Sequence, residues 1–167
     1  PPMKLTGQES RERNVVIAKL AELLSDQRPL HRIDAMFIDA AFGSPIVERL
    51  KVMGYKQVHE ISFGGTSPDH HQSNQRAYQW AKMKEWLVNG LIAKNDVVLA
   101  HELGVPGFHL NRREQLVLEP KDSIVGRGES STDHADALSL TFAMPVNTSA
   151  MRGRVLWMPA ATHWAAG

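Results

Sequence analysis

One short apolar run limits the fold of this chain more than any other feature. Residues 35–38 read AMFI, and Asp39 follows them directly. A strand that is covered on both faces has such a continuous apolar sequence, as the central strands of α/β proteins do. Residues 9–26 have apolar side chains at helical spacing, and residues 55–63 predict a second strand. We therefore predict an α/β fold in which neighbouring strands are parallel.

The remaining elements are predicted from capping residues and periodicity. Between the two strands we expect a helix with Ser44 as its N-cap, Pro45 at its first position and Gly54 past its end. The other predictions are a strand at 1–7, a helix at 74–90, a short helix capped by Asn95, a hairpin at 107–119 with its turn near 111–113, and a closing helix at 131–143. Within residues 74–90, the stripe of Ala77, Trp80, Met83 and Leu87 is interpreted as core.

Composition narrows the function classes. The 167 residues are 43% hydrophobic and 22% charged, which suits one folded domain, predicted here at 1–145, with an irregular tail at 146–167. Cysteine is absent, so a bound metal would need oxygen or histidine ligands. The net charge of +1 does not by itself indicate a nucleic-acid-binding protein, although a local basic patch is compatible with it. No apolar run approaches the length of a membrane span, so we expect no membrane partner.

Asp39 is the first candidate site residue because it ends the predicted buried strand. In open α/β sheets, ligands gather at the carboxyl ends of strands. The alternative is that the carboxylate accepts hydrogen bonds from the amides of the turn that follows. Position alone weighs the two interpretations evenly.

Asp133 and Asp136 lie three residues apart and therefore share a face of the closing helix. Asp133 can be explained as part of the helix cap, where the positive helix end favours an anion. Asp136 lies further inside, where aspartate has no propensity benefit. If Asp39 met Asp136 in space, two carboxylates about 4 Å apart would repel by roughly 4 kcal/mol at an effective dielectric of 20. A divalent ion would relieve this, and oxygen ligands alone favour Mg²⁺ or Mn²⁺.

Other candidate sites are weaker. Residues 69–71 read DHH, which has metal-ligand chemistry but falls in a polar loop. His101 lacks the second histidine of a zincin motif, and no Walker-type phosphate loop occurs.

Five stretches of the sequence resemble those of a known family in their order and spacing. They are MFIDAAFGSPIVERLKVMGY, ISFGG, NQRAYQWAKMKEWLVNGLI, LAHEL and LVLEPKDSIVGRGESSTDHADALSLTF. Together, over about residues 2–144, they are similar to the C-terminal nuclease domain of bacteriophage terminase large subunits. The family's closing motif is usually S-P-D-x-A-D-A-L, and here Thr132 stands in place of the proline.

The resemblance implies a ribonuclease-H-like mixed sheet flanked by helices, with a small β-hairpin insertion. It implies metal-dependent cutting of double-stranded DNA during genome packaging, in the cytoplasm of a bacterial host. Asp39 and Asp136 match two of the family's three acidic positions, and Asp133 matches a further position near the metals. Two Mg²⁺ or Mn²⁺ ions would clamp the phosphodiester, one activating water and the other stabilising the leaving oxygen.

The family's first catalytic aspartate lies on a strand upstream of the part matched here. We therefore expect this chain to lack its first strand or strands and one metal ligand, and to be weakly active or inactive alone. The partners implied for the full protein are an ATPase motor domain, a portal protein and a small terminase subunit.

Three basic residues are candidates for contact with DNA. Lys121 and Arg127 flank the predicted site and would bind phosphates without reading sequence; a solvated basic turn is the equal alternative. Arg76 is as well suited to pairing with a carboxylate as with DNA. Two other functions stay open: a non-catalytic DNA-binding or packaging module, as in a prophage remnant, and another ribonuclease-H-like nuclease such as a junction resolvase.

Overall fold

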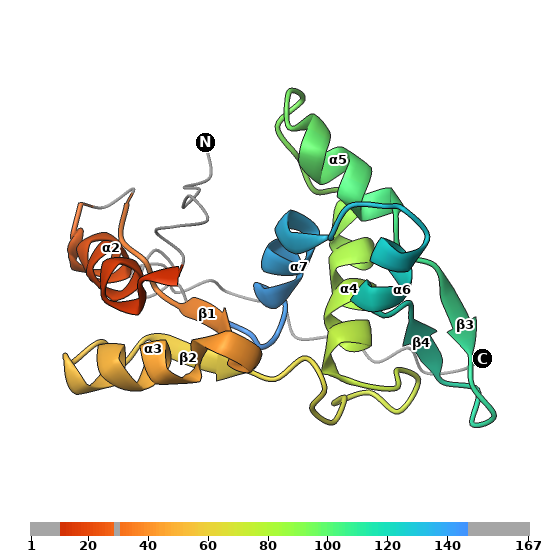
Figure 1. Cartoon of the computed structure of the whole chain (residues 1–167), viewed down its shortest axis with the longest axis horizontal. Coiled ribbons are helices and arrows are strands. Elements are labelled where there is room, and N and C mark those ends of the chain that lie inside the picture. The colour runs from red at the N-terminus through yellow and green to blue at the C-terminus, as the bar shows by residue number, and fades with distance from the viewer. Residues whose placement is uncertain (1–10, 29–30, 147–167) are drawn as a thin grey trace, which may run out of the picture.

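Two separate two-stranded sheets and six helices make up the part of the chain that the computed structural model describes, residues 11–28 and 31–146 (Figure 1). One sheet is parallel and the other is antiparallel. The α/β class is therefore confirmed, while a single mixed sheet is not found among these residues. The predicted strand at 1–7 and almost all of the predicted tail at 146–167 lie outside them.

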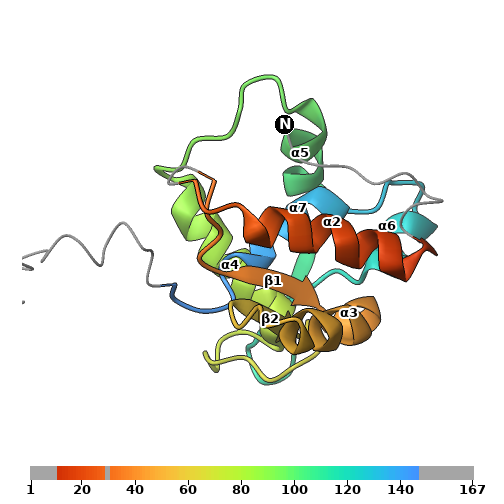
Figure 2. The same ribbon diagram turned by 90° about the vertical axis from the view of Figure 1, so that its left-hand side faces the viewer.

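The apolar run forms a strand of a parallel sheet, as predicted, but the predicted burial on both faces is not found, because all four residues of the strand are half-buried in a two-stranded sheet. Strand β1 (Met36–Asp39) pairs in parallel with β2 (Val58–Ile61), with Met36 opposite Val58 and Asp39 opposite Ile61. Helix α3 (Ala40–Val52) connects the two strands, and α2 (Arg13–Ser25) packs beside it (Figure 2). Residues from these four elements form one core cluster, in which Leu50 and Val58 are fully buried.

The predicted start of α3 is wrong. The helix begins at Ala40 with Asp39 as its N-cap, so Pro45 lies inside it rather than at its first position. Ser44 does not cap the helix; its hydroxyl donates to the Ala40 carbonyl at 2.9 Å and to the Glu60 carboxylate at 2.7 Å. The sequence offers two capping residues, and the strand geometry selects the earlier one because β1 runs directly into the helix. Gly54, with φ of 98°, follows the end of the helix as predicted.

The second half of the described chain surrounds helix α4 (Gln75–Leu87). Its other elements are α5 (Val97–Gly104), β3 (Phe108–Leu110), β4 (Leu116–Leu118), α6 (Lys121–Gly126) and α7 (Asp133–Leu140). Strands β3 and β4 form the predicted antiparallel hairpin, whose turn includes Asn111. The cap of α5 is Asp96 rather than Asn95, because the Asp96 carboxylate accepts from the Leu99 amide at 3.1 Å. Helix α6 was not predicted, and α7 is shorter than the predicted 131–143.

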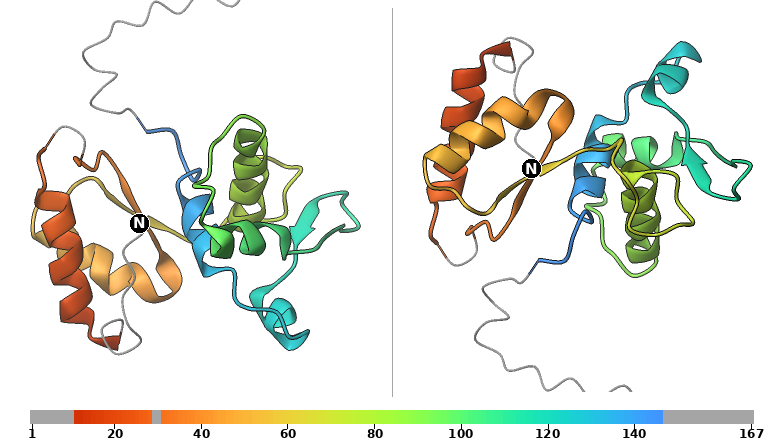
Figure 3. Two further views of the ribbon diagram at one scale, coloured as in Figure 1. Left: turned by 90° about the horizontal axis from the view of Figure 1, so that it is seen from above. Right: turned by 90° about the horizontal axis from the view of Figure 1, so that it is seen from below.

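Helix α7 joins the two halves. Seen from above and below, it lies between the group of α2, α3, β1 and β2 and the group of α4, α5, α6 and the hairpin (Figure 3). On one side, Leu140 packs with Ile61 of β2. On the other, Ala135 packs with Trp80 and Met83 of α4, which confirms the apolar stripe of α4 as core. The helix that carries Asp133 and Asp136 is therefore fixed by both halves.

No helix within the described ranges has the combination of length and apolar character that crossing a membrane would require.

Candidate functional site

A pocket of about 820 Å³ lies where the carboxyl end of β1 approaches the start of α7. Its lining includes two acidic and two basic side chains, namely Asp39, Arg76, Lys121 and Asp133. Asp136 is not among the lining residues. The structure thus brings Asp39 and Asp133 to one cavity, and it places Asp136 behind the cavity wall.

Asp39 is half-buried; its carboxylate caps a helix, and its side chain also lines the pocket. Its carboxylate accepts from the amide of Ala41 at 3.5 Å, a long bond that caps α3. The alternative in which the carboxylate bonds the amides that follow it is therefore observed, at one amide of α3. The same side chain lines the pocket, so capping and a role in the pocket do not exclude each other here.

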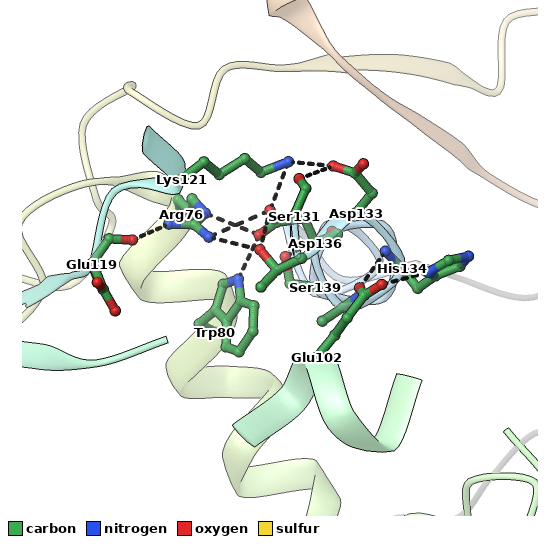
Figure 4. Close-up of polar contacts among 12 residues, drawn as sticks. Arg76, Trp80, Glu102, Glu119, Lys121, Ser131, Asp133, His134, Asp136 and Ser139 are labelled. Atoms are coloured by element: carbon green, nitrogen blue, oxygen red, sulfur yellow. Dashed lines mark hydrogen bonds and ion pairs between the residues drawn. The ribbon is translucent and has the colours of Figure 1, made fainter. Parts of the chain in front are cut away.

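Asp136 is buried, with 3% of its surface exposed, and its Oδ1 atom accepts two hydrogen bonds from α4. Arg76 donates from Nε at 2.9 Å, and Trp80 donates from its indole nitrogen at 2.8 Å (Figure 4). Arg76 is itself buried and also donates to the Glu119 carbonyl at 2.9 Å. A buried charge needs such pairing, since an unpaired carboxylate would cost several kcal/mol.

The other oxygen of Asp136, Oδ2, is approached by three donors. The Lys121 ammonium lies 2.9 Å away, the Thr132 hydroxyl donates at 3.1 Å, and a second nitrogen of Arg76 donates at 3.4 Å. A carboxylate offers about four lone-pair positions, so these contacts leave none free. We call Arg76, Trp80, Lys121, Thr132 and Asp136 the Asp136 cluster.

The charges around Asp136 decide its protonation. Burial opposes ionisation, but the hydrogen bond and the charge of Arg76, with help from Lys121 and Trp80, outweigh it and hold the pKa of Asp136 below its usual value. Asp136 is therefore an anion held by fixed cations. The sequence pattern placed Asp136 further inside the helix, but α7 begins at Asp133, so Asp136 lies in its first turn. The Asp136 cluster explains why an acid is buried there.

Asp133 has a different environment, although it is on the same helix. Its side chain is 71% exposed, and Oδ1 accepts from Lys121 at 2.9 Å and from Ser131 at 2.8 Å. Thr132 is the N-cap residue, and its side chain accepts no capping hydrogen bond from the first amides of the helix. Burial raises the pKa of Asp133, but hydrogen bonds from Lys121 and Ser131 outweigh it and lower the pKa overall. Asp133 thus does not cap the helix through its side chain, and its carboxylate lines the pocket.

The three basic candidates all have carboxylate partners. Arg76 pairs with Asp136, which confirms the alternative that it pairs with an acid. Burial lowers the pKa of Lys121, but hydrogen bonds to Asp133 and Asp136 outweigh it and raise the pKa overall.

Arg127 anchors a different place on the surface. It donates to both oxygens of Glu119 at 3.1 Å, and to the Val105 carbonyl at 2.6 Å. The hydrogen bond from Arg127, with a second from the Gly107 amide, lowers the pKa of Glu119 to about 2. Arg127 therefore ties α6 to the segment between α5 and β3.

The donor set can be tested against a divalent cation. Lys121 already places one positive charge between the carboxylates of Asp133 and Asp136, 2.9 Å from each. This shows that the local charge favours a cation, and that a metal would compete with the ammonium. Asp39 and Asp133 both line the pocket, and carboxylate oxygens are ligands that Mg²⁺ and Mn²⁺ prefer. Asp136 fits only if Arg76 or Lys121 moves away.

A second group of metal-ligand side chains lies elsewhere. Ligand atoms of Asp69, His70 and His71 lie within 4.8 Å of one another. Both histidines are exposed, and Asp69 already accepts from the His71 amide at 2.9 Å, a local turn contact. This loop is not part of the pocket lining.

Sequence reasoning missed several residues that build the site. Trp80 was assigned to the core, yet its indole also bonds Asp136. Its place one helical turn after Arg76 was the available signal. Thr132, noted only as a replacement for proline, is fully buried within the cluster. Glu102 gave no signal, because its partners are 32 and 33 residues away.

Comparison with protein-family models finds no match, and comparisons with curated proteins and with solved structures find none either.

Proposed function

We propose that this chain is a metal-dependent endonuclease domain that cuts double-stranded DNA, of the kind found in phage terminase large subunits. The observation that carries the proposal is the pocket that Asp39 and Asp133 line together, from two different elements. The ordered sequence resemblance supports it, because the same two residues fall within the two motifs that carry the family's acids. A ribonuclease-H-like architecture is part of this proposal.

In this proposal Asp39 and Asp133 hold one or two Mg²⁺ or Mn²⁺ ions. A cation bound there would supply an activated water and would neutralise charge on the scissile phosphate. Asp136 contributes from beneath the pocket: it fixes Lys121 and Arg76, and it reaches a metal directly only if Lys121 is displaced. Asp133 is thereby the stronger ligand candidate of the two aspartates on α7, because its carboxylate is exposed at the pocket.

Lys121 and Arg127 are the proposed phosphate contacts. Lys121 borders the pocket and is 38% exposed at its side chain, and Arg127 is 43% exposed. Both would exchange a carboxylate partner for a phosphate when DNA binds. Such contacts position a duplex without selecting its sequence, and they weaken as salt is raised. Arg76 is buried, so we assign it to holding Asp136 rather than to DNA.

The wider setting follows from the resemblance alone. The domain would work beside an ATPase motor, a portal protein and a small terminase subunit, cutting concatemeric phage DNA in the cytoplasm of a bacterial host. The third acid of the family is not matched in this chain, so we expect weak cutting, or none, by these residues alone.

Metal binding and cutting test the proposal together. Mn²⁺ should bind the parent chain by calorimetry, and Asp39→Asn and Asp133→Asn should each weaken binding at least tenfold. Glu85→Gln is the matched control, because Glu85 is an exposed acid on α4 that pairs with Lys82 and does not line the pocket. Plasmid cutting with Mn²⁺ is then compared between the parent chain and its Asp39→Asn variant, at protein concentrations high enough to detect weak cutting. Equal cutting by the parent and by Asp39→Asn would refute the assignment.

One observation favours a non-catalytic DNA-binding module instead. Asp39 caps α3, Asp133 and Asp136 share Lys121, and Asp136 has no free lone pair. All three acids therefore make contacts that stabilise the fold without a metal. Salt-dependent binding of duplex DNA combined with no Mn²⁺ binding by the parent chain would support this module and reject the nuclease.

A further inference from the structure

Glu102 is a buried acid for which the proposed chemistry has no use. It lies on α5, has 3% of its surface exposed, and is the buried residue of that helix. Neighbouring Leu103 is partly buried and packs against the cluster of Trp80, Met83 and Ala135. Placing a carboxylate in such a position is costly unless it is fully paired, so its partners carry the argument.

The partners of Glu102 are all at the start of α7 (Figure 4). One oxygen accepts from the amide of His134 at 2.7 Å and from the amide of Ala135 at 2.9 Å. The other oxygen lies 2.6 Å from Nδ1 of the His134 ring. These two amides are among the first of the helix, which have no partner within the helix itself.

The contact therefore replaces the cap that α7 lacks. Thr132, at the N-cap position, accepts no hydrogen bond from the first amides of the helix, because its hydroxyl bonds the Asp136 carboxylate instead. A carboxylate from another helix instead satisfies the free amides and lies at the positive end of the helix dipole. Since α7 has only eight residues, its first turn is a large part of the helix.

That first turn also carries Asp133. The residue directly precedes the two amides that Glu102 holds, and its carboxylate lines the pocket. We propose that Glu102 is a positioning residue: it caps α7 from α5 and thereby fixes where the Asp133 carboxylate lies in the pocket. The capping part stands on the geometry alone, whereas its importance for a metal rests on the proposed function.

Hydrogen exchange at single amides, measured by NMR, tests the cap without any metal. In Glu102→Ala, the amides of His134 and Ala135 should exchange about tenfold faster than in the parent chain, the factor that corresponds to a lost cap. The Leu50 amide in the other half of the molecule should be unchanged. Faster exchange at Leu50 by the same factor, or no change at His134 and Ala135, would overturn the cap.

Two further variants allow the cap to be tested if Glu102→Ala folds poorly. Glu102→Gln retains a carbonyl oxygen that can accept from the same amides, so exchange should rise by less than in Glu102→Ala. Glu85→Ala deletes an exposed acid from α4 and should change neither amide. Acceleration of these two amides in Glu85→Ala as large as in Glu102→Ala would contradict the assignment.

Mn²⁺ calorimetry tests the positioning part. Glu102→Ala should weaken Mn²⁺ binding about tenfold, and Glu102→Gln should restore most of it, although neither change touches Asp39 or Asp133. Parent-like Mn²⁺ affinity in Glu102→Ala, together with faster exchange, would overturn positioning and keep the cap. If the parent chain itself binds no Mn²⁺, the proposed function fails and positioning for a metal fails with it, while the exchange result still decides the cap.

Discussion

Two aspartates that lie one turn apart on α7, Asp133 and Asp136, give the same chemical group two different environments. At the pocket, the Asp133 side chain is 71% exposed, whereas on the buried side the Asp136 side chain is 4% exposed. Lys121 lies 2.9 Å from both carboxylates, so one cation serves an exposed partner and a buried one. Only the buried acid, Asp136, also accepts hydrogen bonds from Arg76 and Trp80.

This difference in burial predicts that one carboxylate contributes to the stability of the fold and the other to ligand binding. A buried carboxylate with fixed donors is held rigidly and is expensive to disturb, whereas an exposed one contributes little to folding and can exchange partners. Asp136 therefore belongs to the structure that supports the pocket. Asp133 and Asp39 are the acids that a ligand can reach.

Removing the buried acid should have the largest effect. Asp136→Ala leaves the Arg76 guanidinium buried without its partner, and we expect the free energy of unfolding to fall by about 3–5 kcal/mol. Urea unfolding followed by circular dichroism measures it. Asp133→Ala, the matched change on the exposed side, should cost less than about 1 kcal/mol. Equal losses of unfolding free energy in the two variants would show that the two carboxylates do not differ in their contribution to stability.

A double replacement sharpens this result. Arg76→Met combined with Asp136→Leu removes both charges and should be much less destabilising than either single change, because no unpaired charge is left. A loss equal to the sum of the two single losses would show that the pair is not coupled.

Low pH should have the next largest effect, because it protonates Asp136 and lowers the free energy of unfolding. The pKa of Asp136 is lower in the folded chain than when unfolded, so its stabilising contribution is complete above the usual pKa of about 4 and is lost as the pH falls towards the folded value. The difference in unfolding free energy between the parent and Asp136→Asn should therefore be constant from about pH 7 to 5. It should shrink below about pH 4, and a difference that grew on acidification would have the wrong sign.

Thr132 gives a smaller test of the same cluster. Its buried hydroxyl donates to Asp136 and accepts from Arg76 at 3.3 Å. Thr132→Val keeps the shape, removes both bonds and should cost about 1–3 kcal/mol. Thr141→Val, on an exposed threonine at the end of α7, is the control and should be near neutral. Thermal unfolding of the two variants separates them.

The smallest expected stability effect is at the pocket. Asp39→Asn keeps an oxygen that can cap α3, and the long 3.5 Å bond to Ala41 is easily replaced, so the unfolding free energy should change by less than about 0.5 kcal/mol. The same variant should lose Mn²⁺ binding under the proposed function. A large loss of stability would instead assign Asp39 to the structural group with Asp136.

Local sequence signals predicted the elements well and their ends less well. The apolar run, the spacing of Trp80 and Met83, and the turn at Asn111 concern neighbours in the chain, and these elements are found. The start of α3 was wrong because Ser44 and Asp39 both suit a cap, and only the path of β1 chooses between them. Helix α6 was missed because its six residues have no long apolar period.

For the candidate site, the sequence identified the candidate acids but not the environment of each. It placed Asp39 at a strand end, and it placed Asp133 and Asp136 on one helix face. The tertiary structure decided which of them is buried, because Arg76 lies 60 residues before Asp136 and meets it only when α4 packs against α7. A carboxylate takes its character from surrounding charges and water, and here those come from distant segments. Glu102 is the extreme case, since nothing near it in the sequence shows that it caps another helix.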